Sequence, residues 1–148
     1  MMTGVTIRVL IAHDDPAVRR VLTIFLADAD DMTVIGEAGS GREAIEMIER
    51  FGPDVVLIDC RMADVDCLEV ARLVEARGGD VGIVVLDTYG DRALEAAEAG
   101  ASGHVLKDAL RERLLEAIMG AATSSSDKPA RDARKEAPDS TKRQTESE

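Results

Sequence analysis

Polar side chains that could bind a cation or a phosphate group follow several short apolar stretches of this sequence. His13 and Asp14 follow the first stretch, Asp59 and Asp87 lie at the ends of two later ones, and Lys107 follows the last. Carboxylates gathered at one place repel one another unless a cation lies between them. Their hard oxygen atoms suit Mg²⁺, which readily takes a phosphate partner. Each residue alone is ordinary in a loop after a strand, but together they indicate a site for Mg²⁺ and a phosphoryl group.

Apolar stretches of strand length must bring these side chains together. They alternate with longer segments in which apolar residues recur at helical spacing. This alternation predicts an α/β fold with a doubly wound parallel sheet and helices on both faces. The carboxyl ends of parallel strands lie at one edge of the sheet, where open α/β proteins bind ligands. The expected strands are residues 7–12, 33–38, 55–59, 82–86 and 103–106.

Capping patterns mark where helices should begin between these strands. Asp15 precedes Pro16, and a proline at the first helical position after an aspartate cap is a common helix start. Ser40 and Glu43 have the spacing of a capping box. We therefore expect helices that begin near these residues, followed along the chain by helices at about 67–77, 91–99 and 108–119.

The composition excludes several classes of protein. The net charge is −11, and the excess of acids lies in the first 120 residues, so this part should repel nucleic acid and anionic membranes. No apolar run reaches the length of a membrane span, and the N-terminus lacks the pattern of a signal peptide. Cys60 and Cys67 form no disulfide framework and suit a reducing compartment, where we interpret them as packing residues. We expect a cytoplasmic protein with no direct nucleic-acid or membrane partner.

The last part of the chain differs from the rest in composition. Serine, proline and charged residues of both signs dominate residues 123–148, and alanine is their only apolar type. Such a segment cannot bury enough apolar surface to offset the entropy that is lost on ordering. The sequence therefore predicts one folded domain, residues 1–122, and a disordered tail, residues 123–148.

Residues 7 to about 119 resemble a response-regulator receiver domain, most closely the receivers that precede a helix-turn-helix in NarL/LuxR-type regulators. The resemblance rests on three segments, VLIAHDDP at 9–16, PDVVLIDCRM at 53–62 and AGASGHVLKD at 99–108. It implies a flavodoxin-like fold with strand order 2-1-3-4-5 and a place in a two-component phosphorelay. Nothing after residue 122 resembles a helix-turn-helix, so we expect a receiver without this output domain.

The resemblance also implies a role for each strand-end residue. Asp59 aligns with the phospho-accepting aspartate, and Asp14 with the acid that holds magnesium, together with Asp59 and the backbone carbonyl of Arg61. Lys107 aligns with the lysine that pairs with the phosphoryl group, and His104 occupies the switch position. In this chemistry the cation and the lysine offset the charge of the incoming phosphoryl group while Asp59 acts as the nucleophile. The implied partner is a sensor histidine kinase or another signalling protein, and the resemblance also allows a homodimer.

Two departures from the receiver pattern affect this chemistry. His13 stands where receivers have another acid, and it is either a further metal ligand or a neutral replacement that weakens metal binding.

Asp87 stands where receivers have a Ser or Thr that donates to the phosphoryl group. An ionised carboxylate cannot donate and would repel the phosphoryl group; alternatively, Asp87 turns to solvent and caps the following helix. Thr88 cannot replace the hydroxyl, because a shift of one residue along a strand reverses the face. We expect weak magnesium binding and slow or absent phosphorylation of Asp59.

These departures favour an atypical receiver, or pseudo-receiver, that acts as a signalling and protein-interaction module largely independently of phosphorylation. The alternative is a phosphorylatable single-domain response regulator that uses Asp59 and magnesium. An enzymatic function fits the sequence less well. A phosphatase of the haloacid dehalogenase type needs an acid two residues after its nucleophile, where this chain has Arg61. A flavodoxin needs a phosphate-binding loop after the first strand, where the acids Asp14 and Asp15 would repel the phosphate. DNA binding would need a basic surface.

Overall fold

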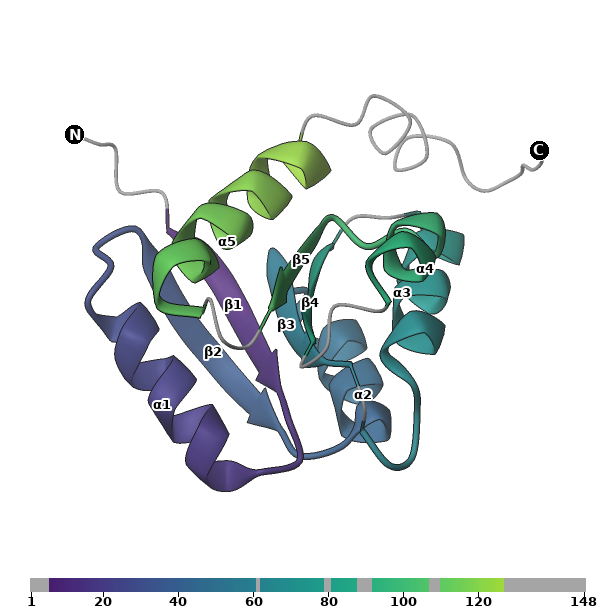
Figure 1. Ribbon diagram of the computed structural model, residues 1–148, viewed down its shortest axis with the longest axis horizontal. Helices are drawn as coiled ribbons and strands as arrows, with labels where there is room; N and C mark the ends of the chain where they lie inside the picture. The colour runs from purple at the N-terminus through teal and green to yellow at the C-terminus, as the bar shows by residue number, and fades with distance from the viewer. Residues whose placement is uncertain (1–5, 61, 79–80, 88–91, 107–109, 127–148) are drawn as a thin grey trace.

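The computed structural model describes residues 6–60, 62–78, 81–87, 92–106 and 110–126 of the chain. Its strands form one parallel sheet in the order β2-β1-β3-β4-β5, which confirms the expected flavodoxin-like topology (Figure 1). The strands are β1 (Ile7–Ala12), β2 (Met32–Ala38), β3 (Val55–Asp59), β4 (Gly82–Asp87) and β5 (Gly103–Leu106). The helices are α1 (Pro16–Ala27), α2 (Gly41–Phe51), α3 (Cys67–Ala76), α4 (Ala93–Glu98) and α5 (Leu110–Ser126).

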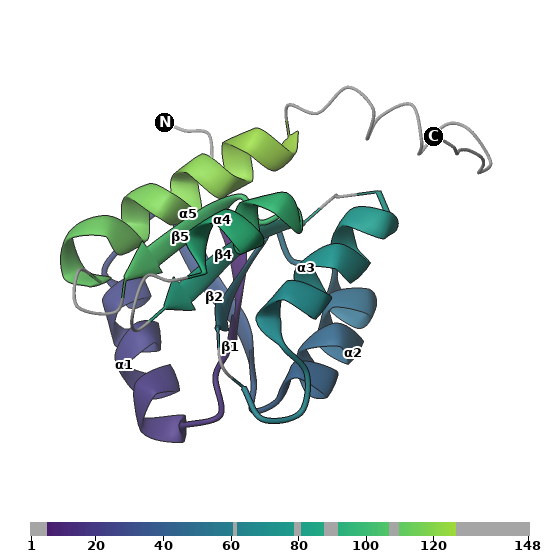
Figure 2. The ribbon, with the colours of Figure 1, turned by 45° about the vertical axis from the view of Figure 1, so that its right-hand side comes forward.

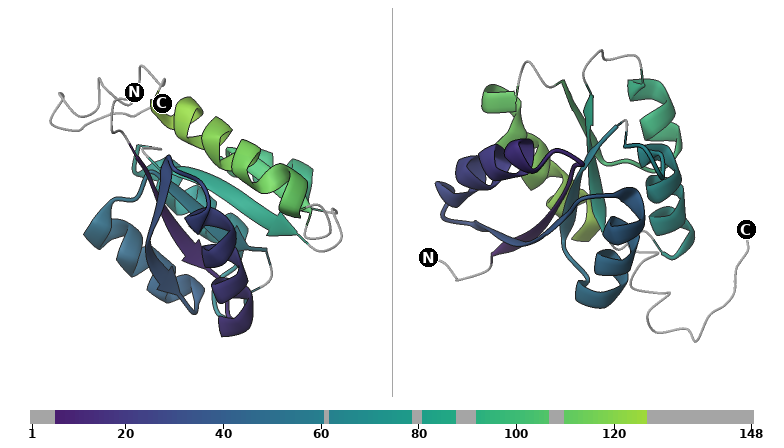
Figure 3. Two further views of the ribbon diagram at one scale, coloured as in Figure 1. Left: turned by 90° about the vertical axis from the view of Figure 1, so that its left-hand side faces the viewer. Right: turned by 90° about the horizontal axis from the view of Figure 1, so that it is seen from below.

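Helices cover both faces of the sheet. Figures 2 and 3 show α1 and α5 on one face and α2, α3 and α4 on the other. Alternate residues of the central strands pack against opposite layers: Leu10 and Ile58 face α2–α4, whereas Ile11 and Leu57 face α1 and α5. Every residue of β3 and β4 is buried, as expected for strands covered on both faces. Within the described ranges, none of the helices has the length and apolar character that crossing a bilayer requires.

Polar caps begin the helices where the sequence predicts them. The carboxylate of Asp15 accepts the backbone N–H of Ala17 at 2.9 Å, directly before Pro16 begins α1. The hydroxyl of Ser40 accepts the backbone N–H of Glu43 at 3.1 Å at the start of α2. Each such cap typically stabilises a helix by about 1 kcal/mol. The caps therefore fix where the chain leaves the strand ends that carry the candidate site.

Two helices differ in length from the prediction. Helix α4 covers only Ala93–Glu98, and its cap residue Arg92 makes no side-chain capping bond. Helix α5 runs on to Ser126 instead of ending near residue 119. Ala121 is buried, and a Cβ at Gly82 would lie only 2.8 Å from its carbonyl oxygen, so this end of α5 packs closely on the start of β4. The expected boundary at residue 122 therefore falls inside a helix. Residues 127–148 lie outside the described residues, where the expected disorder stays a prediction.

Candidate functional site

Strands β1 and β3 bring three of the predicted site residues together. Ala12 and Ile58 are partners in the β1–β3 ladder, so His13, which directly follows β1, and Asp59, the last residue of β3, lie beside each other. Both side chains are buried, with about 5% of each residue exposed. His13, Asp14 and Asp59 each offer one ligand atom, and these atoms lie within 4.8 Å of one another. The expected gathering of strand-end residues is thus present for these three.

The His13 ring lies between two carboxylates. Its Nε2 is 3.5 Å from Oδ1 of Asp59, and its Nδ1 is 3.3 Å from Oδ1 of Asp14. The backbone N–H of Asp15 also donates to Nδ1 at 3.0 Å. A ring that accepts at Nδ1 carries its proton on Nε2 when neutral, so this proton points toward Asp59. The separation of 3.5 Å is longer than a good hydrogen bond, so the His13–Asp59 pair is a loose electrostatic contact.

This donor set fits magnesium poorly. Mg²⁺ prefers oxygen ligands in near-octahedral geometry, whereas imidazole nitrogen suits zinc and other transition ions. Among the described residues the candidate metal-binding group contains His13 with two aspartates, and it does not include Asp87. Arg61 and Lys107 lie outside the described residues. Their predicted roles, as carbonyl ligand and as partner of the phosphoryl group, therefore stay predictions.

Strands β4 and β5 carry a second pair of site residues. Asp87 is the last residue of β4 and is fully buried, and its Oδ2 lies 3.0 Å from Nε2 of the half-buried His104 on β5. The same oxygen accepts the backbone N–H of Arg92 at 3.3 Å. Asp87 therefore does not turn to solvent, although it does bind the backbone where α4 begins, as the capping alternative expected. The Asp87–His104 pair was not predicted, since it depends on how two strands pair. Thr88 lies outside the described residues.

Arg92 joins the two halves of the site and was not singled out from the sequence. Its guanidinium donates to both carboxylate oxygens of Asp66, at 2.9 and 3.1 Å, and to the carbonyl of Cys60 at 3.4 Å. Its backbone N–H donates to Oδ2 of Asp87. Arg92 thus ties the loop after Asp59 to the end of β4. Asp66 and Cys60 are 26 and 32 residues away from Arg92 along the chain, so no local sequence pattern could have indicated these contacts.

Backbone contacts hold the loop between β3 and α3 in place. Asp64 accepts the backbone N–H groups of Gly41 and Arg42 at 2.9 and 3.0 Å, and these bonds hold the pKa of its carboxyl below the usual value. Burial alone would raise the pKa of Asp66. Hydrogen bonds from the backbone N–H of Leu68 and from the Arg92 guanidinium outweigh this effect, so the pKa of Asp66 is lowered. The loop that follows Asp59 is therefore anchored at the starts of α2, α3 and α4.

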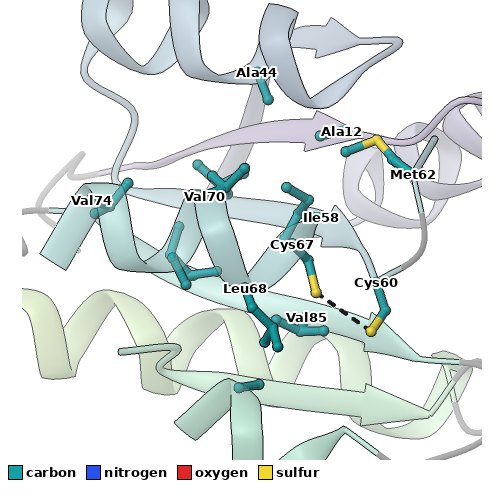
Figure 4. Packing of buried hydrophobic residues seen from close by; sticks show 14 of the residues in the cluster. Ala12, Ala44, Ile58, Cys60, Met62, Cys67, Leu68, Val70, Val74 and Val85 are labelled. Carbon is teal, nitrogen blue, oxygen red and sulfur yellow. Dashed lines mark hydrogen bonds between the residues drawn. The ribbon is translucent and has the colours of Figure 1, made fainter. Parts of the chain in front are cut away.

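The two cysteines pack against each other beside this loop. Figure 4 shows the sulfur atoms of Cys60 and Cys67 facing each other within the apolar layer, 3.4 Å apart. Both are buried thiols. Burial, together with the neighbouring Cys60 sulfur, raises the pKa of Cys67 well above its usual range. Since the thiolate is the reactive form, this geometry agrees with the interpretation of both cysteines as packing residues.

Comparison with known proteins identifies the family. The family model "Response regulator receiver domain" matches residues 9–119. The uncharacterized transcriptional regulatory protein YxjL of Bacillus subtilis (strain 168) is 38% identical over 118 residues, which make up 78% of this chain and 54% of that protein. The chain spans about half the length of the curated relatives it matches.

Solved receiver structures show the same architecture. The signal receiver domain of a response regulator, NarL, from Mycobacterium tuberculosis is 30% identical with a TM-score of 0.76, and the match covers 81% of this chain and 98% of that one. The response regulator domain of Thermotoga maritima CheB is 27% identical with a TM-score of 0.73, covering 80% and 97%. The residues that the family model matches include the sheet from Val9 of β1 onward and the strand-end residues His13, Asp59 and Asp87. This chain belongs to the response regulator receiver domain family.

Proposed function

We propose that this receiver domain is a protein-interaction module of a two-component-type pathway whose signalling is largely independent of phosphorylation. The observation that carries the proposal is the Asp87–His104 pair. The resemblance to receivers implies a Ser or Thr hydroxyl at position 87 that donates to the phosphoryl group. Here the position holds a fully buried carboxylate, 3.0 Å from an imidazole nitrogen.

A phosphoryl group on Asp59 would meet unfavourable electrostatics near Asp87. An ionised carboxylate has no hydrogen to donate, so a charge-assisted bond worth about 1.5–3 kcal/mol is lost. Phosphate on a side chain carries nearly two negative charges at neutral pH. Two unit charges about 4 Å apart repel by roughly 4 kcal/mol at an effective dielectric constant of 20. His104 can offset part of this repulsion, but its Nε2 already binds Asp87, and so we expect phosphorylation to be disfavoured.

The Asp87–His104 pair also fixes the side chain at the switch position, His104, without a phosphoryl group. His104 lies on β5, and its bond to Asp87 joins the end of β4 to this strand. The resemblance implies that in receivers the residue at position 87 bonds to the phosphoryl group instead. In this chain the link is built from residues alone. We therefore propose that the surface formed by α4, β5 and α5 keeps one state whether or not Asp59 is modified.

Apolar side chains on that surface support a protein partner. Several large apolar residues there are exposed to a third or more of their area, and a protein partner docked on these elements would bury them. The partner proposed is a sensor histidine kinase or another signalling protein, in the cytoplasm, and the acidic net charge of −11 argues against direct nucleic-acid binding. Receiver domains are generally non-enzymatic signalling modules. The exposed residues are Leu94, Leu106, Leu115 and Met119.

The second candidate function is a phosphorylatable single-domain regulator. It is favoured by the position of Asp59 at the end of β3, beside Asp14. The two candidates differ in one measurable quantity, the extent of phosphorylation by a small donor.

Incubation with acetyl phosphate and Mg²⁺, followed by intact mass spectrometry, separates the two candidates. We expect only a trace of phosphoryl adduct on the unaltered protein. Asp59→Asn is the matched control because it removes the predicted acceptor while keeping the size of the side chain. A stoichiometric adduct that disappears in Asp59→Asn would contradict the proposal and support the phosphorylatable regulator.

A further inference from the structure

We propose that the group formed by His13, Asp14 and Asp59 selects a divalent first-row transition ion, such as Zn²⁺, over Mg²⁺. The group has a nitrogen donor at one corner and carboxylate oxygens at the other two. Imidazole suits zinc and its neighbours in the transition series, whereas Mg²⁺ takes oxygen ligands and gives up its water reluctantly. The proposal concerns which ion the site selects, and it holds whether or not Asp59 accepts a phosphoryl group.

The distance between His13 and Asp59 is close to that of two ligands that share an ion. Two ligand atoms about 2.1 Å from one ion lie roughly 3.0–3.4 Å apart at octahedral or tetrahedral angles. Nε2 of His13 is 3.5 Å from Oδ1 of Asp59, which is long for a direct hydrogen bond and close to that range. Both residues are buried, so neither side chain has to be ordered from solvent when an ion binds.

Asp14 completes the group from the solvent side. About half of its side chain is exposed, and its Oδ1 lies 3.3 Å from Nδ1 of His13. Histidines that bind metal through one ring nitrogen usually donate from the other to a carboxylate, which fixes the tautomer. Asp14 can therefore accept the Nδ1 proton with Oδ1 and hold the ring so that Nε2 faces Asp59, where the ion would bind.

The ring must change tautomer for Nε2 to bind an ion. In the structure the backbone N–H of Asp15 donates to Nδ1, which leaves the proton of a neutral ring on Nε2. Binding through Nε2 moves that proton to Nδ1, where Asp14 replaces the Asp15 N–H as partner. This exchange weakens affinity for any ion that binds through Nε2. A preference for a transition ion therefore requires that its bond to Nε2 outweighs this cost.

Transition ions bind most nitrogen and oxygen sites more tightly than Mg²⁺ does, so tighter binding of Zn²⁺ alone does not show that His13 causes the preference. The test therefore compares the Zn²⁺ and Mg²⁺ association constants of the unaltered protein with those of variants at His13. Calorimetric titrations with Zn²⁺ and Mg²⁺ would use untagged protein, so that His13 and His104 are the only histidines present. His13→Asn should lower the Zn²⁺ association constant at least about tenfold, the scale seen for changes at metal sites. His13→Asp should lower the ratio of Zn²⁺ to Mg²⁺ association constants by at least the same factor. Circular dichroism checks that each variant is folded, and if His13→Asn is not, Asp59→Asn removes the other buried ligand instead.

Two controls locate the ion. His104→Asn removes the other histidine and should leave Zn²⁺ affinity within about twofold, a change that corresponds to less than 0.5 kcal/mol. The double variant Cys60→Ser, Cys67→Ser should do the same, and Co²⁺ bound to the unaltered protein should lack the intense near-ultraviolet absorption of a thiolate complex. The proposal is overturned if His13→Asn keeps its Zn²⁺ affinity, if His13→Asp leaves the ratio unchanged, or if binding is lost with the cysteines. The acetyl phosphate result does not bear on any of these outcomes.

Discussion

The two histidines of this chain each lie beside a buried aspartate, yet the two pairs are built differently. His13 and Asp59, at the ends of β1 and β3, are 3.5 Å apart, with the half-exposed Asp14 at their side. His104 and Asp87, on β5 and β4, are 3.0 Å apart, and Asp87 is fully buried. The first pair is loose and reaches solvent through Asp14, whereas the second is a closed hydrogen bond.

This difference assigns cation binding to the first pair and the setting of the switch position to the second. The loose pair and the exposed carboxylate beside it place three candidate ligand atoms within 4.8 Å of one another. A closed pair around a buried carboxylate holds two strands together, because a buried charge is costly unless it is paired. We infer that the site of this receiver keeps a place for a cation but has its switch position fixed by residues of the chain.

The largest expected effect comes from breaking the closed pair. His104→Ala should lower the free energy of unfolding by about 3 kcal/mol, because it removes a hydrogen-bond partner from a fully buried carboxylate. Urea denaturation followed by circular dichroism measures this, since the chain contains no tryptophan. Adding Asp87→Asn to this variant should recover part of the loss, because a neutral amide costs less to bury. A loss below about 1 kcal/mol would mean that the pair contributes little.

A smaller effect is expected where Arg92 joins the two halves of the site. Asp66→Ala should cost about 2 kcal/mol at neutral pH, since it removes the cap of α3 and the carboxylate that holds the largely buried Arg92 guanidinium. Asp64→Ala is the matched control, because Asp64 lies in the same loop but binds the start of α2 instead.

The cost of Asp66→Ala should also depend on pH. The folded pKa of Asp66 is below its ordinary value of 3.8, so the ionised carboxylate stabilises the fold fully above that value. This stabilisation is lost as the pH falls through the lower, folded pKa. The difference between the variant and the unaltered protein should therefore be full at neutral pH and shrink as the solution is acidified below about pH 4. A difference that stays constant into acid would show that the charge of Asp66 is unimportant.

The smallest of these effects should come from the loose pair. His13→Ala should cost only about 1 kcal/mol, because the ring lies 3.5 Å from Asp59, which is longer than a good hydrogen bond, and the Asp15 N–H contributes an ordinary bond. The same urea titration measures it. If His13→Ala costs as much as His104→Ala, the contrast between the two pairs is wrong.

Most of the fold could be predicted from the sequence, because buried strands are continuous apolar runs. The bounds of β1, β3 and β5 agree with the expected 7–12, 55–59 and 103–106. The cap at Asp15 is equally local. The end of α5 could not be predicted, because residues beyond 119 have no apolar periodicity and their helix depends on packing against β4.

The site could be predicted only in part. The gathering of His13, Asp14 and Asp59 follows from parallel strands ending at one edge of the sheet. The environment of Asp87 could not be predicted, because it depends on the register of β4 with β5 and on a partner distant in sequence. A pattern of residue types indicates which positions depart from the family, while only the packing shows what each departure does.

The most direct test of the central claim is to restore a hydroxyl at position 87. Asp87→Thr and the unaltered protein would be incubated with acetyl phosphate and Mg²⁺, and phosphoryl adducts would be counted by intact mass. Binding of beryllofluoride, a phosphoryl mimic, would be titrated in parallel. We predict that Asp87→Thr raises both quantities at least several-fold, since a regained charge-assisted bond is worth about 1.5–3 kcal/mol. No change in either quantity would contradict this prediction and would place the obstacle at His13 or in the loop after Asp59.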